Sequence, residues 1–133
     1  MLKKTITYTN YNDEQKTKDY YFNLKKSELI DLQFSTAKGF MDYIEEITKI
    51  QDNVKIWKAF RDIVLLAYGE KSDDGERFVK SDELRKSFEE TEAFSELIYE
   101  LMSNETAAAN FINGIMPADL TAQAKQGKLD VVD

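Results

Sequence analysis

The first 24 residues alternate between apolar and polar positions with the two-residue period of a half-buried β-strand. Two alternating runs are separated by residues 10–14, where Asn and Asp tolerate the backbone dihedrals of a turn. The pattern predicts a β-hairpin over residues 1–24, whose apolar face rests on helices because a two-stranded hairpin is only marginally stable alone. The residues predicted to share that face are Ile6, Tyr8, Tyr20, Phe22 and Leu24.

A helical spacing, with an apolar residue every three or four positions, replaces this alternation after residue 26. Together the two patterns predict a mainly α, α+β fold, in which the N-terminal hairpin packs on a bundle of about five or six short helices. The predicted helices span residues 27–33, 40–50, 54–68, 82–89, 91 or 92 to 102, and 103 or 104 to 113.

The segment 54–68 has the widest apolar surface of these helices. A helix that is apolar around so much of its circumference is usually buried on several sides. We therefore expect this segment to be the central core helix, with Gly69 in the left-handed conformation that often ends a helix. Its apolar stripe consists of Ile56, Trp57, Phe60, Ile63, Val64 and Ala67, widened by Leu65, Leu66 and Tyr68.

Residues with capping preferences mark the ends of several helices. Asn23 or Ser27 is placed to cap the first helix, and Ser81 to cap the helix over residues 82–89. Gly114 is predicted to close the last helix. Pro117, the only proline, forbids a simple continuation of that helix.

The chain is predicted to form one globular domain over residues 1–120, of which residues 27–120 are the helical part. Within it, residues 70–80 form a polar connection with an Asp-Gly turn, after which residues 77–80 could form a short strand. Residues 121–133 are polar and small, so we expect a flexible tail.

Missing residue types limit the chemistry of this chain. It contains no His and no Cys, so it lacks the commonest general base, the thiolate nucleophile and the soft metal ligands.

Its N-terminus has no apolar run typical of a signal peptide, and no stretch approaches the ~20 apolar residues of a membrane span. We therefore expect a cytosolic protein.

The net charge of −7 is unevenly distributed along the chain. Residues 1–69 carry a net charge of +1, and residues 70–133 carry −8. The acidic second half repels nucleic acid and anionic lipid, because neutralising phosphates requires Lys and Arg. It favours either simple solubility or attraction to a basic protein surface.

Adjacent acids occur at positions 45–46, 73–74 and 89–90, but they have no catalytic setting. A carboxyl pair that works as acid and base needs one partner in an apolar pocket, whereas these pairs lie on polar helix faces or in a turn. Residues 73–76 resemble part of a calcium loop without the ligand spacing of an EF-hand. We expect no enzymatic activity, no metal site and no cofactor.

Two sets of apolar side chains leave binding functions open. Tyr20, Tyr21 and Phe22 lie near lysines and could stack nucleic-acid bases, although their alternation more simply places Tyr20 and Phe22 on the core face. The second set is a compact cluster near Gly114, which either packs on the core or forms an adaptable docking patch. The candidate partner-binding residues in this cluster are Phe111, Ile112, Ile115 and Met116.

Five segments of the chain form a recognisable series when they are taken in order. They are residues 1–8 (MLKKTITY), 20–24 (YYFNL), 68–78 (YGEKSDDGERF), 91–97 (TEAFSEL) and 111–120 (FINGIMPADL). This series resembles that of the tail assembly chaperones of long-tailed phages that infect Gram-positive bacteria. One departure is Lys25, which stands where such proteins often have the threonine that opens the first helix.

The resemblance implies a chaperone that binds the long, largely helical tape measure protein, keeps it soluble and helps recruit tail tube subunits. It implies a protein of the host cytoplasm that is absent from the mature virion and that could self-associate. Many relatives also exist as a longer product of a −1 ribosomal frameshift, the form that mainly contacts the tail tube protein. Residues 126–128 can be encoded with a slippery heptamer, so we hypothesise slippage there.

Two other classes of function remain as alternatives. An acidic phage-encoded inhibitor that mimics nucleic acid would need carboxylates arrayed on one exposed face, and the lysines at positions 55, 58, 80 and 86 weaken that interpretation. A hydrolase or transferase would need a constellation of reactive groups, which the sequence does not provide.

Overall fold

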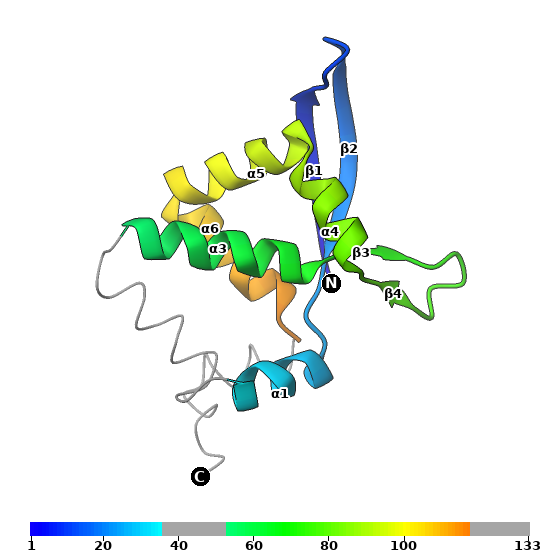
Figure 1. Cartoon of the computed structure of the whole chain (residues 1–133), viewed down its shortest axis with the longest axis vertical. Helices are drawn as coiled ribbons and strands as arrows, with labels where there is room; N and C mark the ends of the chain where they lie inside the picture. Colours follow the sequence, from blue (N-terminus) through cyan, green and yellow to red (C-terminus); the bar gives the residue numbers. More distant parts are fainter. Residues whose placement is uncertain (36–52, 118–133) are drawn as a thin grey trace.

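The structure, a computed structural model, describes residues 1–35 and 53–117 (Figure 1). The predicted helix over residues 40–50 and the predicted tail over residues 121–133 lie outside these ranges. An N-terminal antiparallel hairpin followed by helices confirms the predicted α+β fold. In chain order the elements are β1 (Leu2–Thr9), β2 (Gln15–Phe22), α1 (Lys26–Ser35), α3 (Asn53–Ala67), β3 (Tyr68–Lys71), β4 (Phe78–Val79), α4 (Asp82–Glu89), α5 (Glu92–Ser103) and α6 (Glu105–Ile115).

The N-terminal hairpin forms as predicted, with its turn at residues 10–14. Strands β1 and β2 pair along their whole length, from Leu2 opposite Phe22 to Thr9 opposite Gln15. At the tip the Asn10 side chain accepts the Asn12 and Glu14 N–H groups, and Asp13 takes a positive φ of 61°. The alternation buries the predicted apolar side, because Ile6, Tyr8, Phe22 and Leu24 are buried and Tyr20 is half-buried.

The sheet is larger than the sequence predicted, with the described strands in the order β1-β2-β3-β4. Helix α3 passes directly into β3, which pairs with β2 at Tyr21 and Phe22 and with β4 on its other side. The predicted short strand over residues 77–80 is therefore present as β4, and residues 68–71, expected to be helix end and polar connection, form its partner. The chain reverses between them at Gly75, whose φ is 75°.

The predicted role of Gly69 as a left-handed helix terminator is wrong. Gly69 lies within β3, and only Gly75 among the described glycines has a positive φ. A Cβ atom at position 69 would lie 2.7 Å from the Phe78 ring and 2.8 Å from the Val79 carbonyl oxygen. The glycine is needed because β4 approaches the backbone of β3 closely.

The prediction that Gly114 closes the last helix is also wrong, because Gly114 lies inside α6. Helix α6 continues to Ile115, two residues before Pro117. A Cβ atom at position 114 would lie 2.9 Å from Leu2 Cδ1, so the missing side chain allows α6 to pack against the start of β1.

Side-chain caps fix the starts of three helices. The hydroxyl of Ser81 accepts the Leu84 N–H at 3.0 Å, as predicted for α4. Thr91 caps α5 and also donates to the Phe88 carbonyl oxygen at 2.6 Å, so one hydroxyl connects two helices. Such caps each contribute about 1 kcal/mol.

Helix α1 begins without a capping side-chain oxygen before it. The prediction of Asn23 or Ser27 as its cap is wrong, because Lys25 occupies the capping position and its carbonyl oxygen accepts the Leu29 N–H. Glu28 compensates, since its carboxylate accepts the Lys25 N–H at 3.0 Å. In a capping box the N-cap side chain accepts the N–H of the third helical residue, and the side chain of that residue accepts the N-cap N–H. Helix α1 has the second of these hydrogen bonds. A threonine at position 25 could supply the first, which Lys25 cannot.

An aromatic cluster joins the sheet to the helices. Phe22, which is fully buried, contacts the rings of Tyr68, Phe88 and Phe111 at centroid distances of 5.8, 5.7 and 5.3 Å. Tyr68 and Phe88 stack at 4.3 Å with an interplanar angle of 14°. Helices α3, α5 and α6 lie together on one side of the β1–β2 ribbon, and the β3–β4 hairpin projects on the other (Figure 1).

We expect Phe22→Ala to destabilise the fold by about 3–5 kcal/mol, because a fully buried ring is lost and a cavity forms between strand and helices. Urea unfolding followed by circular dichroism measures the change. Tyr99→Ala is the control, since Tyr99 is 75% exposed and its loss should change stability by no more than about 0.5 kcal/mol. Equal effects of the two variants would contradict the assignment of Phe22 to the core.

Gly69→Ala should cost about 1–3 kcal/mol, because its methyl group would press on the Phe78 ring and on a backbone oxygen. Gly75→Asn, which meets open space at a backbone conformation that Asn tolerates, should cost less than about 1 kcal/mol. Thermal unfolding of both variants gives the stability change where glycine allows close approach (Gly69) and where it allows a positive φ (Gly75). A more stable Gly69→Ala variant would show that β4 is not held where the structure places it.

Candidate partner-binding groove

The four residues predicted to bind a partner divide between the interior and the surface. Phe111 and Ile115 are only 2% and 1% exposed, and Met116 is also buried, so these three side chains pack in the core. Ile112 is half-buried and faces a groove. The structure therefore brings the four together on one helix end but offers only Ile112 to a partner.

The groove that Ile112 lines runs between three helices, and we call it the α3–α5–α6 groove. Its volume is about 740 Å³. Apolar side chains from each helix form its walls, and polar groups of the α5–α6 turn form part of its rim. The lining residues are Ile56, Phe60, Leu101, Met102, Ser103, Asn104, Glu105, Ala108, Ala109, Ile112 and Asn113.

A sharp turn at Asn104 positions the α5 and α6 walls. Asn104 is extended (φ −143°, ψ 107°) and ends α5 while it caps α6. Its side chain accepts the Ala107 N–H at 3.0 Å, and the Ser103 hydroxyl donates to the Tyr99 carbonyl oxygen. Since Ala108 and Ala109 follow this turn, the α6 wall is lined by methyl groups and leaves room beside it.

The third wall is the N-terminal half of α3, which is not buried as the sequence analysis expected. Trp57 is 38% exposed and Val54 is 74% exposed. The C-terminal half of α3 enters the core through Ile63, Val64 and Ala67, whereas in the N-terminal half Ala59 is the buried hydrophobic residue. The prediction of a central helix buried on several sides is therefore correct for half of α3 and wrong for the other half.

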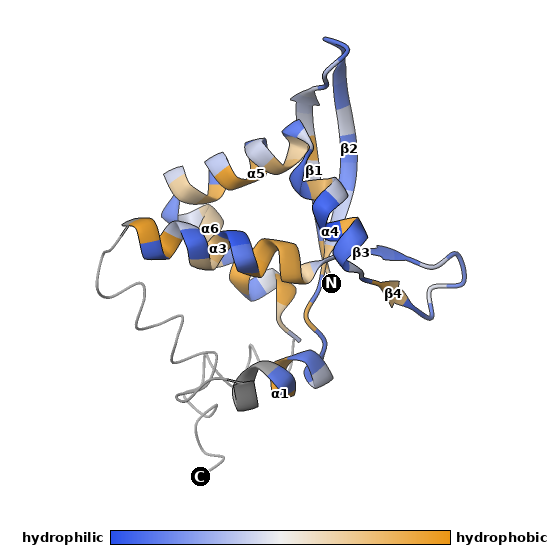
Figure 2. Cartoon of the chain, in the orientation of Figure 1, coloured by the Kyte–Doolittle hydropathy of each residue, from blue (hydrophilic) through white to orange (hydrophobic). Residues whose placement is uncertain are grey.

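The helices that form the walls of the groove differ in charge. On its side toward α4, Arg61 of α3 donates through Nε to Glu89 Oε2 at 2.9 Å. Helix α3 carries three basic residues and one acid, whereas α5 and α6 together carry four Glu and no Lys or Arg. The groove thus lies between one helix with an excess of basic residues and two helices with an excess of acidic ones. Hydrophobic segments are visible on all three helices in Figure 2.

The paired acids have the wrong surroundings for acid–base catalysis. The Ser72 hydroxyl and the Glu76 N–H lower the pKa of Asp74, where a general acid needs a raised value. Glu89 is paired with Arg61, and the pair at 45–46 lies outside the described residues. Within residues 1–35 and 53–117 no cluster of three or more Asp or Glu is placed to hold a metal ion.

The aromatic residues considered for base stacking are used elsewhere. Phe22 and Tyr20 point into the aromatic cluster, where burial raises the pKa of the Tyr20 hydroxyl and Tyr20 lies 3.3 Å from the Tyr8 hydroxyl. Tyr21 faces the other side, under the Lys71 ammonium at 4.9 Å.

None of the helices in the described ranges has the length and apolar character that a bilayer crossing demands.

A comparison with protein families matches residues 1–131 to the family described as phage tail assembly chaperone. The match covers nearly the whole chain. The chain belongs to this family. The resemblance found in the sequence is thereby confirmed. No curated protein matches the chain, and no solved structure matches it.

Sequence reasoning found one wall of the chaperone's groove and missed the other two. Ile112 belonged to the predicted cluster, but Ile56, Phe60 and Met102 were assigned to the core because their spacing is that of a buried stripe. A usable signal was present in the breadth of the apolar surface of residues 54–68. A short helix with more apolar faces than its neighbours can cover has apolar surface left for a partner.

We expect the groove to bind a neutral apolar dye such as Nile red, and Ala109→Glu to reduce the dye's fluorescence enhancement by about twofold or more. The variant places a charge in the groove at an exposed site of α6. Asn110→Glu adds the same charge one residue along, outside the groove, and should leave the enhancement unchanged. Equal responses of the two variants would show that the dye binds elsewhere.

Proposed function

We propose that this tail assembly chaperone binds the tape measure protein by taking one of its apolar helical stripes into the α3–α5–α6 groove. The observation that supports this proposal is an apolar groove, walled by three helices, in a protein of this family. In the same assembly the chaperone keeps the tape measure protein soluble and helps recruit tail tube subunits. It acts through contact and not through catalysis.

The groove suits a helical ligand for steric reasons. An amphipathic helix presents apolar side chains every three or four residues, and these fit between helices that offer both large and small side chains. Ile56, Phe60 and Met102 supply large adaptable surface, while Ala108 and Ala109 allow close approach. We propose that Ile112 touches the ligand and that Phe111, Ile115 and Met116 support it from the core.

Reversibility follows from the modest size of a single groove. One site of this kind holds a helix weakly, but many copies along one long ligand hold it strongly and can still be displaced one at a time. Self-association of neighbouring copies would strengthen the coating further. Such a protein works in the host cytoplasm and is absent from the finished virion, since tube subunits replace it.

Recruitment of the tail tube protein is proposed to depend mainly on a longer form made by frameshifting at residues 126–128. The support for this proposal is a sequence that permits a slippery heptamer. These residues lie outside the described part of the chain, so the proposal rests on coding potential and on family membership. A gene without a repeated-base heptamer at those codons would remove it.

The alternative of an acidic inhibitor that mimics nucleic acid has less support. Its carboxylates would have to form an open array, yet Lys4 of β1 pairs with Glu100 of α5 at 2.8 Å. Arg61 engages Glu89 on α4, and Arg85 lies 3.3 Å from Asp82. Interspersed cations therefore interrupt the acidic surface of the described helices.

Co-expression with the tape measure protein of the same phage tests the proposed function. We expect the affinity-tagged chaperone to keep the tape measure protein in the soluble fraction and to copurify with it. Ala109→Glu should reduce the copurified amount about tenfold, because a desolvated carboxylate in the groove opposes apolar contact. The matched Asn110→Glu variant should retain the wild-type amount.

Two results would contradict this proposal. A tape measure protein that stays soluble when co-expressed with an unrelated protein needs no chaperone. Equal copurification with both charge variants would place the contact outside the groove. Both substitutions lie at exposed positions of α6, so we expect both variants to fold. Thermal unfolding of the purified variants checks that they do.

A further inference from the structure

A second pocket, with four basic residues among its nine lining residues, lies beside the β3–β4 hairpin, which projects away from the helices of the groove (Figure 1). Its volume is about 560 Å³. We call it the basic pocket, and its basic lining side chains come from three places in the sequence. They are Lys25, Lys71, Arg77 and Lys80.

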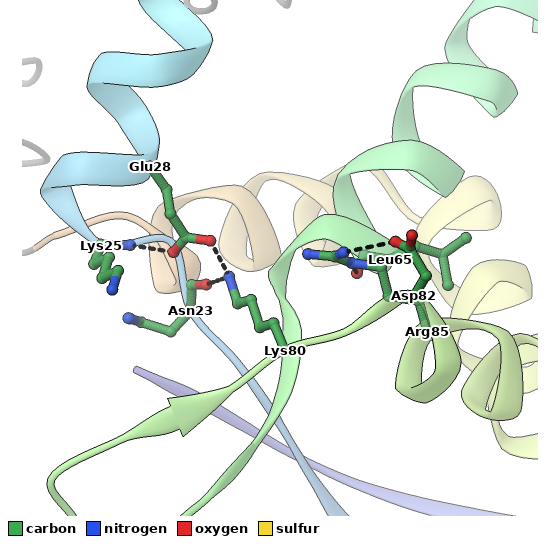
Figure 3. A network of polar contacts seen from close by, with 7 residues as sticks. All are labelled: Asn23, Lys25, Glu28, Leu65, Lys80, Asp82 and Arg85. Atoms are coloured by element: carbon green, nitrogen blue, oxygen red, sulfur yellow. Dashed lines mark hydrogen bonds and ion pairs between the residues drawn. The ribbon is translucent and has the colours of Figure 1, made fainter.

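Lys80 is neutralised within the protein and fixes the pocket wall. Its ammonium donates to Glu28 Oε2 at 2.6 Å and to the Asn23 carbonyl oxygen at 2.7 Å (Figure 3). The first contact ties the end of β4 to the start of α1, and the second ties it to the segment after β2. Partial burial lowers the pKa of Lys80.

The other three cations have no such partner. In the part of the chain that the structure describes, no carboxylate lies within 4.0 Å of the side-chain nitrogens of Lys25, Lys71 or Arg77. Glu76 is the single acid in the pocket lining. Three unpaired cations against one carboxylate give the pocket a positive charge in a chain whose net charge is −7.

Hydrogen bonds close the loop between β3 and β4, at whose two ends Lys71 and Arg77 lie. The Arg77 N–H donates to the Ser72 hydroxyl at 3.0 Å, and the Arg77 carbonyl oxygen accepts the Ser72 N–H at 2.9 Å. Asp74 accepts the Ser72 hydroxyl and the Glu76 N–H, which closes the turn. Lys71 is positioned over the Tyr21 ring, so binding a ligand costs less entropy for the Lys71 side chain than for a freely rotating lysine.

The strand beside the cations indicates the shape of the ligand. β4 is the last strand of the described sheet, and its residues Phe78 and Val79 line the basic pocket. An edge strand offers unpaired backbone groups to an extended segment. An extended chain also places every second side chain on one side, where its carboxylates can reach the cations.

We propose that the basic pocket binds an extended acidic segment of a protein partner. The cations supply attraction, Phe78 and Val79 supply apolar contact, and the edge of β4 supplies backbone pairing. Nucleic acid fits less well, because three unpaired cations neutralise few phosphates while the acidic remainder of the chain repels a polyanion. This site is independent of the α3–α5–α6 groove.

Fluorescence anisotropy with a labelled decapeptide of alternating glutamate and valine tests this proposal on the full chain. We expect binding that weakens as NaCl rises from about 0.05 to about 0.3 M, since exposed charges are screened. The double variant Lys71→Glu/Arg77→Glu should weaken binding about tenfold or more. Lys16→Glu/Lys18→Glu makes the same charge change on β2 and should alter binding less than about twofold.

The comparison of peptides and variants decides the proposal. Equal loss in both double variants would reduce the effect to net charge and overturn the assignment of the pocket. Equal binding of a decapeptide of alternating serine and valine would remove the role of the cations. Tighter binding of a single-stranded oligonucleotide than of the acidic peptide would identify a different class of partner and would also overturn it.

Discussion

The stacking of aromatic rings between β2, β3 and the helices is the interaction on which the rest of the structure depends. Phe22 and Phe88 each contact several rings, and through them the hairpin is joined to α4, α5 and α6. Large aromatic side chains bury more area than any other residues and add directional ring contacts. Because a two-stranded ribbon is only marginally stable alone, its contacts with the helices through this cluster stabilise it, and the same contacts hold α5 and α6, which form two walls of the groove.

Placing the core here has a consequence for α3. Its C-terminal half is drawn into the cluster and continues as β3, so its N-terminal half extends beyond the core and leaves Trp57 partly exposed. The end of α5 extends in the same way, with Met102 at the surface. Among the described residues, the apolar groove therefore lies where the core ends, between the exposed parts of α3 and α5 and the start of α6.

The sequence predicted elements well where local chemistry alone decides them. The hairpin alternation and the Ser81 cap are confirmed, because period and capping depend on neighbouring residues. It failed where one residue type serves two purposes. Gly69 was taken for a helix end, but glycine also permits close approach, and only the position of β4 distinguishes the two. An apolar stripe has the same spacing whether it meets the core or a partner, so the groove could not be found from spacing.

The proposed groove and the proposed basic pocket use different physical forces, and this difference has a mechanistic value. Apolar contact in the groove is insensitive to salt, whereas attraction in the basic pocket is screened within about 8 Å at physiological ionic strength. The cations lie beside an ordered turn, and the groove lies between helices on the other side of the ribbon. The two proposed sites share no lining residue, so a ligand in one does not sterically block the other, and a change in ionic strength would weaken binding at only one of them.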